Sequence, residues 1–120
     1  MAGVVVPATV VGVSICYLAI DVGGVKLAAA VVSEQGEVLV RDRIATPQRE
    51  VWPALSRLVL RVMAAAPTPP VGCGVGCGGP MNPAERTVSP LYIPSWKALP
   101  LAAEVEALTE LTTVVTNTGK

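Results

Sequence analysis

The amino-acid sequence predicts an α/β domain with a mixed five-stranded sheet and elements in the order β-β-β-α-β-α-β. Three observations lead to this fold class. Short apolar runs bounded by turn residues indicate buried strands, and one long stretch repeats its apolar residues at helical spacing. Very short connections join the first three predicted strands, which indicates an antiparallel meander, whereas helices separate the later strands.

The first two predicted strands surround a glycine turn. Residues 15–22 form a continuous apolar run that ends at Asp21 and Val22 and is followed by Gly23 and Gly24. This pattern is typical of a buried strand that enters a tight turn. Residues 26–33 form a second apolar run, and turn formers at 33–36 end it.

The third predicted strand covers residues 37–44 and alternates imperfectly, as an outer strand allows. Strict alternation places Val38 and Val40 on one face together with Asp42. The opposite face then carries Leu39, Arg41 and Arg43.

The clearest helix lies within residues 47–66, where apolar residues form one stripe. Proline is tolerated only in the first turn of a helix, so Pro53 places the start near Val51 or Trp52. A proline-rich segment at 67–70 ends the helix.

The second half of the chain predicts three further elements. Residues 71–78 read as a fourth strand, and 79–97 as a loop rich in proline and turn formers. Residues 101–111 form a short amphipathic helix. The β-branched residues at 112–116 indicate a fifth strand.

Glycines in the fourth strand match the dinucleotide-binding fingerprint by letter only. Gly74, Gly76 and Gly79 have the right spacing, but Pro80 and Pro83 follow where a helix should begin. The run is therefore interpreted as a buried strand of small residues, which a neighbouring backbone or ligand can approach closely.

Composition excludes several classes of function. The 120 residues are enough for one domain, and with 52% hydrophobic and 15% charged residues the chain is not intrinsically disordered. The formal net charge is zero, which argues against a nucleic-acid-binding protein. The chain has no histidine and three cysteines, so we expect neither a zinc site nor a disulfide scaffold. Free thiols suggest a cytoplasmic location.

The N-terminus has no charged residue before Asp21. Residues 1–14 are expected to form a disordered extension ahead of the first strand. An uncharged stretch of this length also leaves a small membrane-anchored protein open as an alternative. The absence of a positive N-terminal region argues against a signal peptide.

Three stretches resemble the N-terminal domain of the ROK family, which comprises bacterial sugar kinases and sugar-responsive repressors. Residues 18–28 (LAIDVGGVKLA) are similar to the family's phosphate loop. Residues 74–81 and 87–96 are similar to its glycine strand and to the segment that contacts the sugar. Residues 114–118 (VVTNT) are similar to its strand that ends in Asn-Asp. The resemblance implies an actin-like ATPase (ribonuclease-H-like) fold.

The resemblance assigns a phosphate-binding role to the first glycine turn. It implies that Asp21, Gly23, Gly24 and Lys26 bind the phosphates of ATP, with Asp21 holding Mg²⁺. The chemistry is reasonable, because glycines let backbone amides approach a phosphate and a carboxylate suits Mg²⁺. The plainer interpretation of the same residues is an ordinary Gly-Gly hairpin with an exposed aspartate and lysine.

The sequence departs from the family pattern at four positions. Val25 replaces a threonine of the phosphate loop, and Tyr92 replaces the asparagine of the sugar-contacting segment. Asn117 matches the family's sugar-binding asparagine, but it equally suits a strand-end turn residue. Thr118 stands in place of the catalytic aspartate, and Thr116 in place of an acidic residue. A threonine hydroxyl is a poor general base near neutral pH, so no catalytic residue is assigned.

The resemblance therefore predicts residues 15–120 to be a ROK-type N-terminal sugar-kinase domain without its second domain. The implied reaction is phosphoryl transfer from ATP to a hexose hydroxyl, and we expect the chain to be inactive alone because half a cleft cannot position both substrates. One alternative is a non-catalytic fragment completed by a second chain or a homo-oligomer. A ROK transcriptional regulator is less favoured, since no basic recognition helix precedes the first strand.

Overall fold

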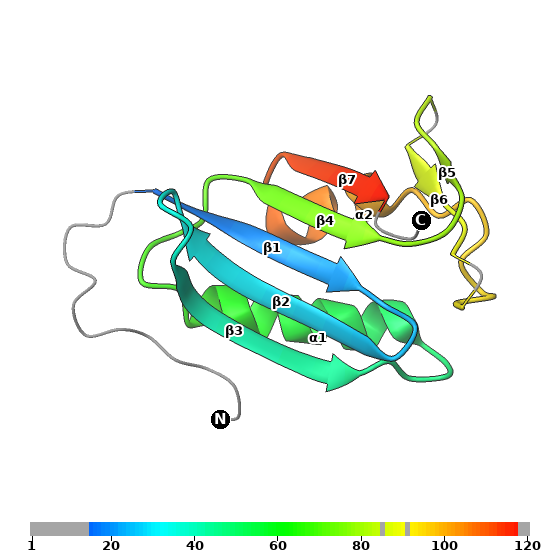
Figure 1. Ribbon diagram of the computed structural model, residues 1–120, viewed down its shortest axis with the longest axis horizontal. Coiled ribbons are helices and arrows are strands. Elements are labelled where there is room, and N and C mark those ends of the chain that lie inside the picture. The colour runs from blue at the N-terminus through cyan, green and yellow to red at the C-terminus, as the bar shows by residue number, and fades with distance from the viewer. Residues whose placement is uncertain (1–14, 85, 91, 118–120) are drawn as a thin grey trace.

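The computed structural model describes residues 15–84, 86–90 and 92–117. Its main sheet has five strands in the spatial order β3-β2-β1-β4-β7 (Figure 1). The elements along the chain are β1 (Cys16–Val22), β2 (Lys26–Ser33), β3 (Val38–Ala45), α1 (Val51–Ala64), β4 (Cys73–Cys77), β5 (Met81–Asn82), β6 (Thr87–Val88), α2 (Leu101–Thr109) and β7 (Thr113–Asn117). The predicted order of strands and helices is confirmed, with one added hairpin.

Pairing within the sheet follows the prediction. β2 runs antiparallel to both β1 and β3, which confirms the meander. β4 runs parallel to β1, and β7 runs parallel to β4. Each parallel pair is joined through a helix, as a crossover between parallel strands requires. This topology is the actin-like ATPase type that the resemblance implied.

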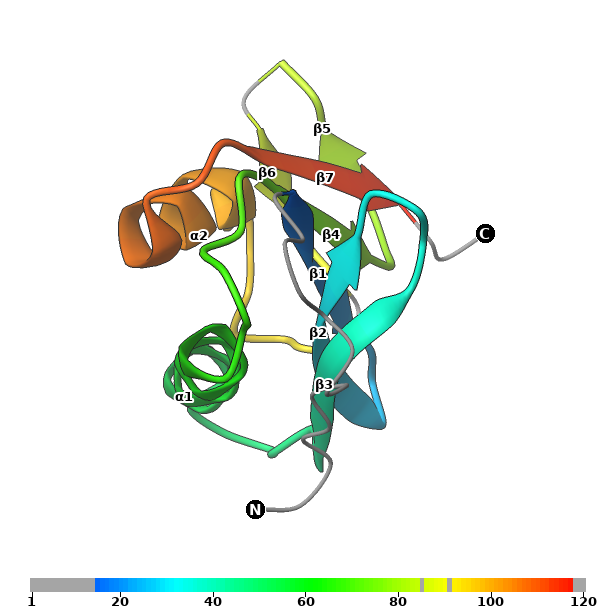
Figure 2. The same cartoon turned by 90° about the vertical axis from the view of Figure 1, so that its left-hand side faces the viewer.

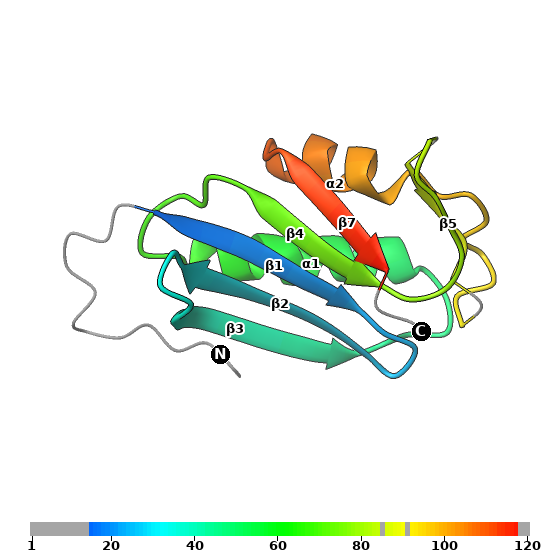
Figure 3. The same cartoon turned by 45° about the horizontal axis from the view of Figure 1, so that its top comes forward.

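Both helices lie on the same face of the sheet (Figure 2). α1 contacts β2 and β3, and α2 contacts β7 (Figure 3). The core between the layers is formed by alternate residues of the strands and by the apolar stripe of α1, including Leu18, Leu27, Leu39, Leu55 and Leu58, each at most 1% exposed. Burying such side chains contributes roughly 1.5–3 kcal/mol each.

No described element covers the opposite face of the sheet. One cross-strand row on this face consists of Arg41, Ala30, Ala19, Gly74 and Val114, and the next consists of Arg43, Ala28, Asp21, Gly76 and Thr116. Small residues therefore fill the middle of the face. A groove of about 580 Å³ lies between the two arginines and the alanines.

The alternation predicted for β3 is wrong at Val38. The pairing of β2 with β3 shifts between Val31 and Val32, so a bulge at Leu39 separates Val38 from Val40. Val38 is consequently exposed while Leu39 and Val40 are both buried. A bulge adds one residue to one strand, so the residues beyond it point to the opposite face of the sheet from the one that strict alternation predicts.

Two other boundaries differ from the prediction. The segment predicted as a loop contains the two-residue strands β5 and β6, which pair antiparallel. α2 ends at Thr109 rather than Leu111, because Glu110 adopts a left-handed backbone with φ of 61°. The Thr109 hydroxyl accepts the N–H of Leu111 at 3.2 Å and stabilises this turn.

The expectation of a disordered extension falls on residues 1–14, which lie outside the described part of the chain. Within the described part, no helix is long and apolar enough to span a membrane.

Candidate functional site

The ends of three parallel strands meet at one edge of the sheet. Val22 of β1 is in register with Cys77 of β4, and Cys77 is in register with Asn117 of β7. The segments that leave these strands therefore lie next to one another (Figure 1). Sheets of this type bind ligands beyond the carboxyl ends of their parallel strands.

The turn after β1 is closed by hydrogen bonds on both sides. The Gly23 N–H donates to the Lys26 carbonyl at 3.0 Å. On the other side, the Thr46 hydroxyl donates to the Gly23 carbonyl at 2.7 Å, and the Thr46 N–H donates to the Val25 carbonyl at 2.9 Å. The turn is thus fixed to the chain that follows β3. Thr46 lies outside every motif, so sequence patterns did not indicate this contact.

Both glycines of the turn have little room for a side chain, Gly23 less than Gly24. A Cβ atom at Gly23 would lie 2.9 Å from the Lys26 carbonyl oxygen, which is closer than real Cβ contacts. A Cβ atom at Gly24 would lie 3.1 Å from both Cβ and Cγ of Tyr92. Glycine is the residue that allows backbone to approach so closely.

Tyr92 connects the ends of β1 and β4. Its hydroxyl donates to the Val22 carbonyl at 2.9 Å and accepts the Gly78 N–H at 2.8 Å. Burial raises the pKa of this hydroxyl, although the bond from Gly78 acts in the opposite direction. The hydroxyl is therefore neutral and fully engaged with main-chain groups near neutral pH.

Asp21 and Lys26 flank the turn and face solvent. Asp21 lies on the open face, where it lines the groove together with Arg41 and Arg43. Neither Asp21 nor Lys26 belongs to the two ion pairs of the described residues. Both charges are therefore accessible to a ligand in water.

The carboxylate of Asp21 fits a Mg²⁺ ion carried by phosphates. Mg²⁺ keeps several waters and usually takes only one or two protein carboxylates alongside phosphate oxygens. The described residues contain no group of three or more metal-ligating side chains. One exposed carboxylate at the strand end is consistent with a Mg²⁺ ion that is bound mainly by phosphate oxygens and waters. It is not consistent with a site built from protein ligands alone.

Asn117 ends β7 and joins the same edge. Its side-chain amide donates to the Gly79 carbonyl at 2.9 Å, which fixes the loop after β4 to the end of β7. The structure thus brings Asn117 to the edge that carries Gly23 and Gly24. Thr118, at the position of the family's catalytic aspartate, lies outside the described residues.

The thiols of β4 face the core. Cys73 and Cys77 are buried and share one face with Val75, as the alternation predicted. Burial raises the pKa of the Cys73 thiol to about 11 and also raises that of Cys77. These thiols are protonated near neutral pH and act as small apolar core residues.

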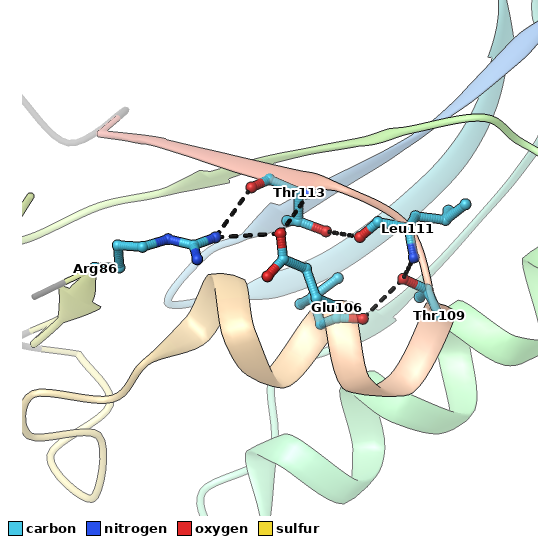
Figure 4. Close-up of polar contacts among 6 residues, drawn as sticks. Arg86, Glu106, Thr109, Leu111 and Thr113 are labelled. Atoms are coloured by element: carbon cyan, nitrogen blue, oxygen red, sulfur yellow. Dashed lines mark hydrogen bonds and ion pairs between the residues drawn. The ribbon is translucent and has the colours of Figure 1, made fainter.

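A second polar cluster lies away from this edge, at the beginning of β7 (Figure 4). Glu106 of α2 accepts the Thr113 N–H at 3.0 Å and pairs with Arg86 at 3.2 Å. Arg86 also donates to the Thr113 carbonyl at 3.5 Å. The two side chains together satisfy the outward main-chain groups of Thr113. The sequence did not indicate this cluster, because its members come from three separate segments.

The sheet order, the one-sided helices and a glycine turn at the carboxyl edge define a domain of the actin-like ATPase class. The pattern of the ROK family matches residues 17–118, so the chain belongs to the ROK family. A glucokinase from Streptomyces coelicolor is 32% identical over 107 residues, which cover 83% of this chain and 32% of that protein.

Two solved structures have the same fold. A ROK family glucokinase from Streptomyces griseus, solved with glucose and AMPPNP, is 29% identical with a TM-score of 0.69, covering 85% of this chain and 33% of that one. A ROK hexokinase from Thermus thermophilus is 24% identical with a TM-score of 0.76, covering 86% and 35%. The chain thus spans about a third of the length of these relatives.

Proposed function

We propose that residues 15–120 are the phosphate-binding half of an ATP-dependent sugar kinase of the glucokinase type. The observation that carries this proposal is the Gly23–Gly24 turn at the carboxyl edge, flanked by the exposed Asp21 and Lys26. The similarity to glucokinases points to ATP as the phosphoryl donor and a hexose as the acceptor.

The phosphate cradle is assigned to the second half of the turn. The Gly23 N–H is already bonded to the Lys26 carbonyl. The N–H groups of Gly24 and Val25 donate to no acceptor among the described residues. Successive backbone amides of this kind bind anions. Lys26 adds a positive charge next to them.

Asp21 and Asn117 complete the assignment. Asp21 would hold the Mg²⁺ ion, which supplies charge neutralisation between the nucleotide phosphates when bound. Asn117 would hydrogen-bond a sugar hydroxyl, since its amide lies at the same edge as the turn. Hexose, ATP and Mg²⁺ are thus the partners proposed for this site.

Phosphoryl transfer by the 120 residues alone is not expected. Catalysis of this reaction rests on positioning both substrates and stabilising the transferred group. The relatives that carry the activity in their names are about three times longer than this chain. We therefore propose that activity requires the remaining part of such a kinase, in the same polypeptide, in a second chain or in a homo-oligomer.

The experiment is an NMR titration of the 120-residue chain with AMPPNP in the presence and absence of Mg²⁺. We expect shifts concentrated at the Gly24 and Val25 amides. Asp21→Asn should remove the Mg²⁺ dependence, and Lys26→Met should weaken binding. Lys97→Met, at an exposed lysine outside the turn, is the matched control and should change nothing.

Two results would count against the proposal. Shifts absent from the turn, or equal effects of Lys26→Met and Lys97→Met, would remove the phosphate-binding assignment. A coupled ADP-release assay with glucose checks the second part, because turnover by the purified 120 residues would show that no further part is needed.

A further inference from the structure

The tyrosine that replaces the family's asparagine makes its contacts with the phosphate turn. Tyr92 comes from the loop between β6 and α2, far in sequence from the turn. Its hydroxyl bonds the Val22 carbonyl, which immediately precedes Gly23, and its ring packs against Gly24. The same hydroxyl holds the Gly78 N–H directly after β4. Tyr92 thus contacts the turn at Gly24 and directly before Gly23, and it connects the turn to the end of β4.

The base of Tyr92 is itself well fixed. Ile93 and Trp96, which follow in the loop, are 2% and 5% exposed and belong to the core. The Ile93 N–H donates to the Pro90 carbonyl at 3.2 Å, and the Trp96 N–H donates to the Ile93 carbonyl at 2.9 Å. A side chain on such a base can transmit a defined position to the turn that it contacts.

The hydroxyl of Tyr92 has no remaining donor for a sugar. A phenol carries a single hydrogen, and here the Val22 carbonyl receives it. In this arrangement the hydroxyl donates to the main chain of the protein and cannot also donate to a ligand hydroxyl.

We propose that Tyr92 is a positioning residue for the phosphate turn, which sets the separation between the Gly23–Gly24 backbone and the end of β4. This inference rests on the proposed function for its ligand, but the contacts that define it belong to the protein alone. The role predicts that loss of the hydroxyl alters the turn without removing any group that touches the nucleotide.

The test compares Tyr92→Phe with Tyr17→Phe. Tyr17 is 43% exposed and Tyr92 is 40% exposed, so the two side chains are similarly exposed overall, and the Tyr92 hydroxyl is the one bonded to the Val22 carbonyl and the Gly78 N–H. Amide hydrogen exchange at Gly78 and the chemical shift of Gly24 report the position of the turn. Affinity for inorganic tripolyphosphate and for Mg²⁺–AMPPNP, followed at the Gly24 and Val25 amides, reports its consequence.

We expect Tyr92→Phe to speed exchange at Gly78 about fivefold, as the loss of one hydrogen bond predicts, and to weaken binding of both probes severalfold. Tyr17→Phe should leave both readouts unchanged. Val62→Ala removes core methyl groups from α1, outside the loop that carries Tyr92, and should lower stability without changing affinity. That control separates positioning from general destabilisation.

Unchanged Gly78 exchange and unchanged affinity in Tyr92→Phe would overturn the inference. An unprotected Gly78 amide in the wild-type chain would overturn it without any variant, in case Tyr92→Phe does not fold. A wild-type chain that binds neither probe would refute the proposed function. In that case, faster exchange at Gly78 together with a shifted Gly24 signal would still support the positioning role.

Discussion

The carboxylate of Glu106 accepts the backbone N–H of Thr113 at 3.0 Å, so a helix side chain satisfies the edge of the last strand. Arg86 pairs with the same oxygen at 3.2 Å. The cluster occupies the place where another strand would otherwise bond to Thr113. Edge strands commonly carry such protection against pairing with other chains.

Glu106 should make stability depend on pH. The bond from Thr113, followed by that from Arg86, lowers the pKa of Glu106 in the folded chain. Its stabilisation is therefore complete above the ordinary glutamate pKa and is lost as the pH falls through the lowered folded pKa. Urea unfolding of wild type and Glu106→Gln from pH 7 to about pH 3 measures this, with glutamate reference values near 4.3. A wild-type advantage that persists unchanged at the acid end would contradict the assignment.

The ion pair between α1 and β3 should contribute more to the free energy of unfolding than a surface pair does. Arg61 of α1 bonds Asp42 of β3 at 2.7 Å, and the Asp42 side chain is only 7% exposed. Arg61→Met leaves this carboxylate without its cation, with only the Arg43 N–H donating to it at 2.8 Å, and should cost about 2 kcal/mol, between the values for surface and buried pairs. Arg57→Met, on an exposed position of the same helix, should cost far less.

Replacing both partners tests the reason for that cost. The double variant Asp42→Val with Arg61→Met removes the buried charge as well as its partner, and should recover most of the lost stability. Chemical unfolding of the wild type, Arg61→Met, Asp42→Val and the double variant measures it. A double variant less stable than Arg61→Met alone would show that the carboxylate has another essential partner.

Three glycine-to-alanine substitutions should rank by the space around each glycine. Gly23→Ala places a Cβ 2.9 Å from a backbone oxygen and should lower the melting temperature most. Gly24→Ala meets Tyr92 at 3.1 Å and should have a smaller effect. Gly74→Ala meets nothing within 4 Å and should be neutral or stabilise by about 0.5 kcal/mol through the unfolded chain. Thermal unfolding that gives another order would contradict the geometry of the turn.

The three thiols should be unreactive in the folded chain. Cys16, Cys73 and Cys77 are buried, and burial raises the pKa of each. Since the thiolate is the reacting species, an aromatic disulfide reagent at pH 8 should modify them only as fast as the protein opens. In urea, all three should react at once. Rapid modification of the native chain by one equivalent would show that one thiol is accessible.

The sequence predicted every strand of the main sheet and both helices, because each carries a clear period or a clear apolar run. It could not predict the bulge at Leu39. The bulge shifts the pairing by only one residue, and an apolar run such as Val38, Leu39 and Val40 is compatible with either pairing. The two-residue strands β5 and β6 were also missed. Strands so short have no period of their own and depend on the chain around them.

The candidate site was also predicted only in part. Resemblance indicated Asp21, Gly23, Gly24, Lys26 and Asn117, and the structure brings the turn and Asn117 to one edge. The resemblance assigned no role to Thr46 or Tyr92. Their partners are main-chain atoms 23 and 70 residues away, and a sequence pattern does not record such contacts.

The parallel register of Val22, Cys77 and Asn117 sets a fixed distance along this edge of the sheet. Two strand spacings separate the Gly23–Gly24 turn from the amide of Asn117, a span of roughly 10 Å. Main-chain hydrogen bonds set this length, so exchanging core side chains leaves it unchanged. A ligand that reaches both ends must match that span, and only a change in strand pairing would select a longer or shorter one.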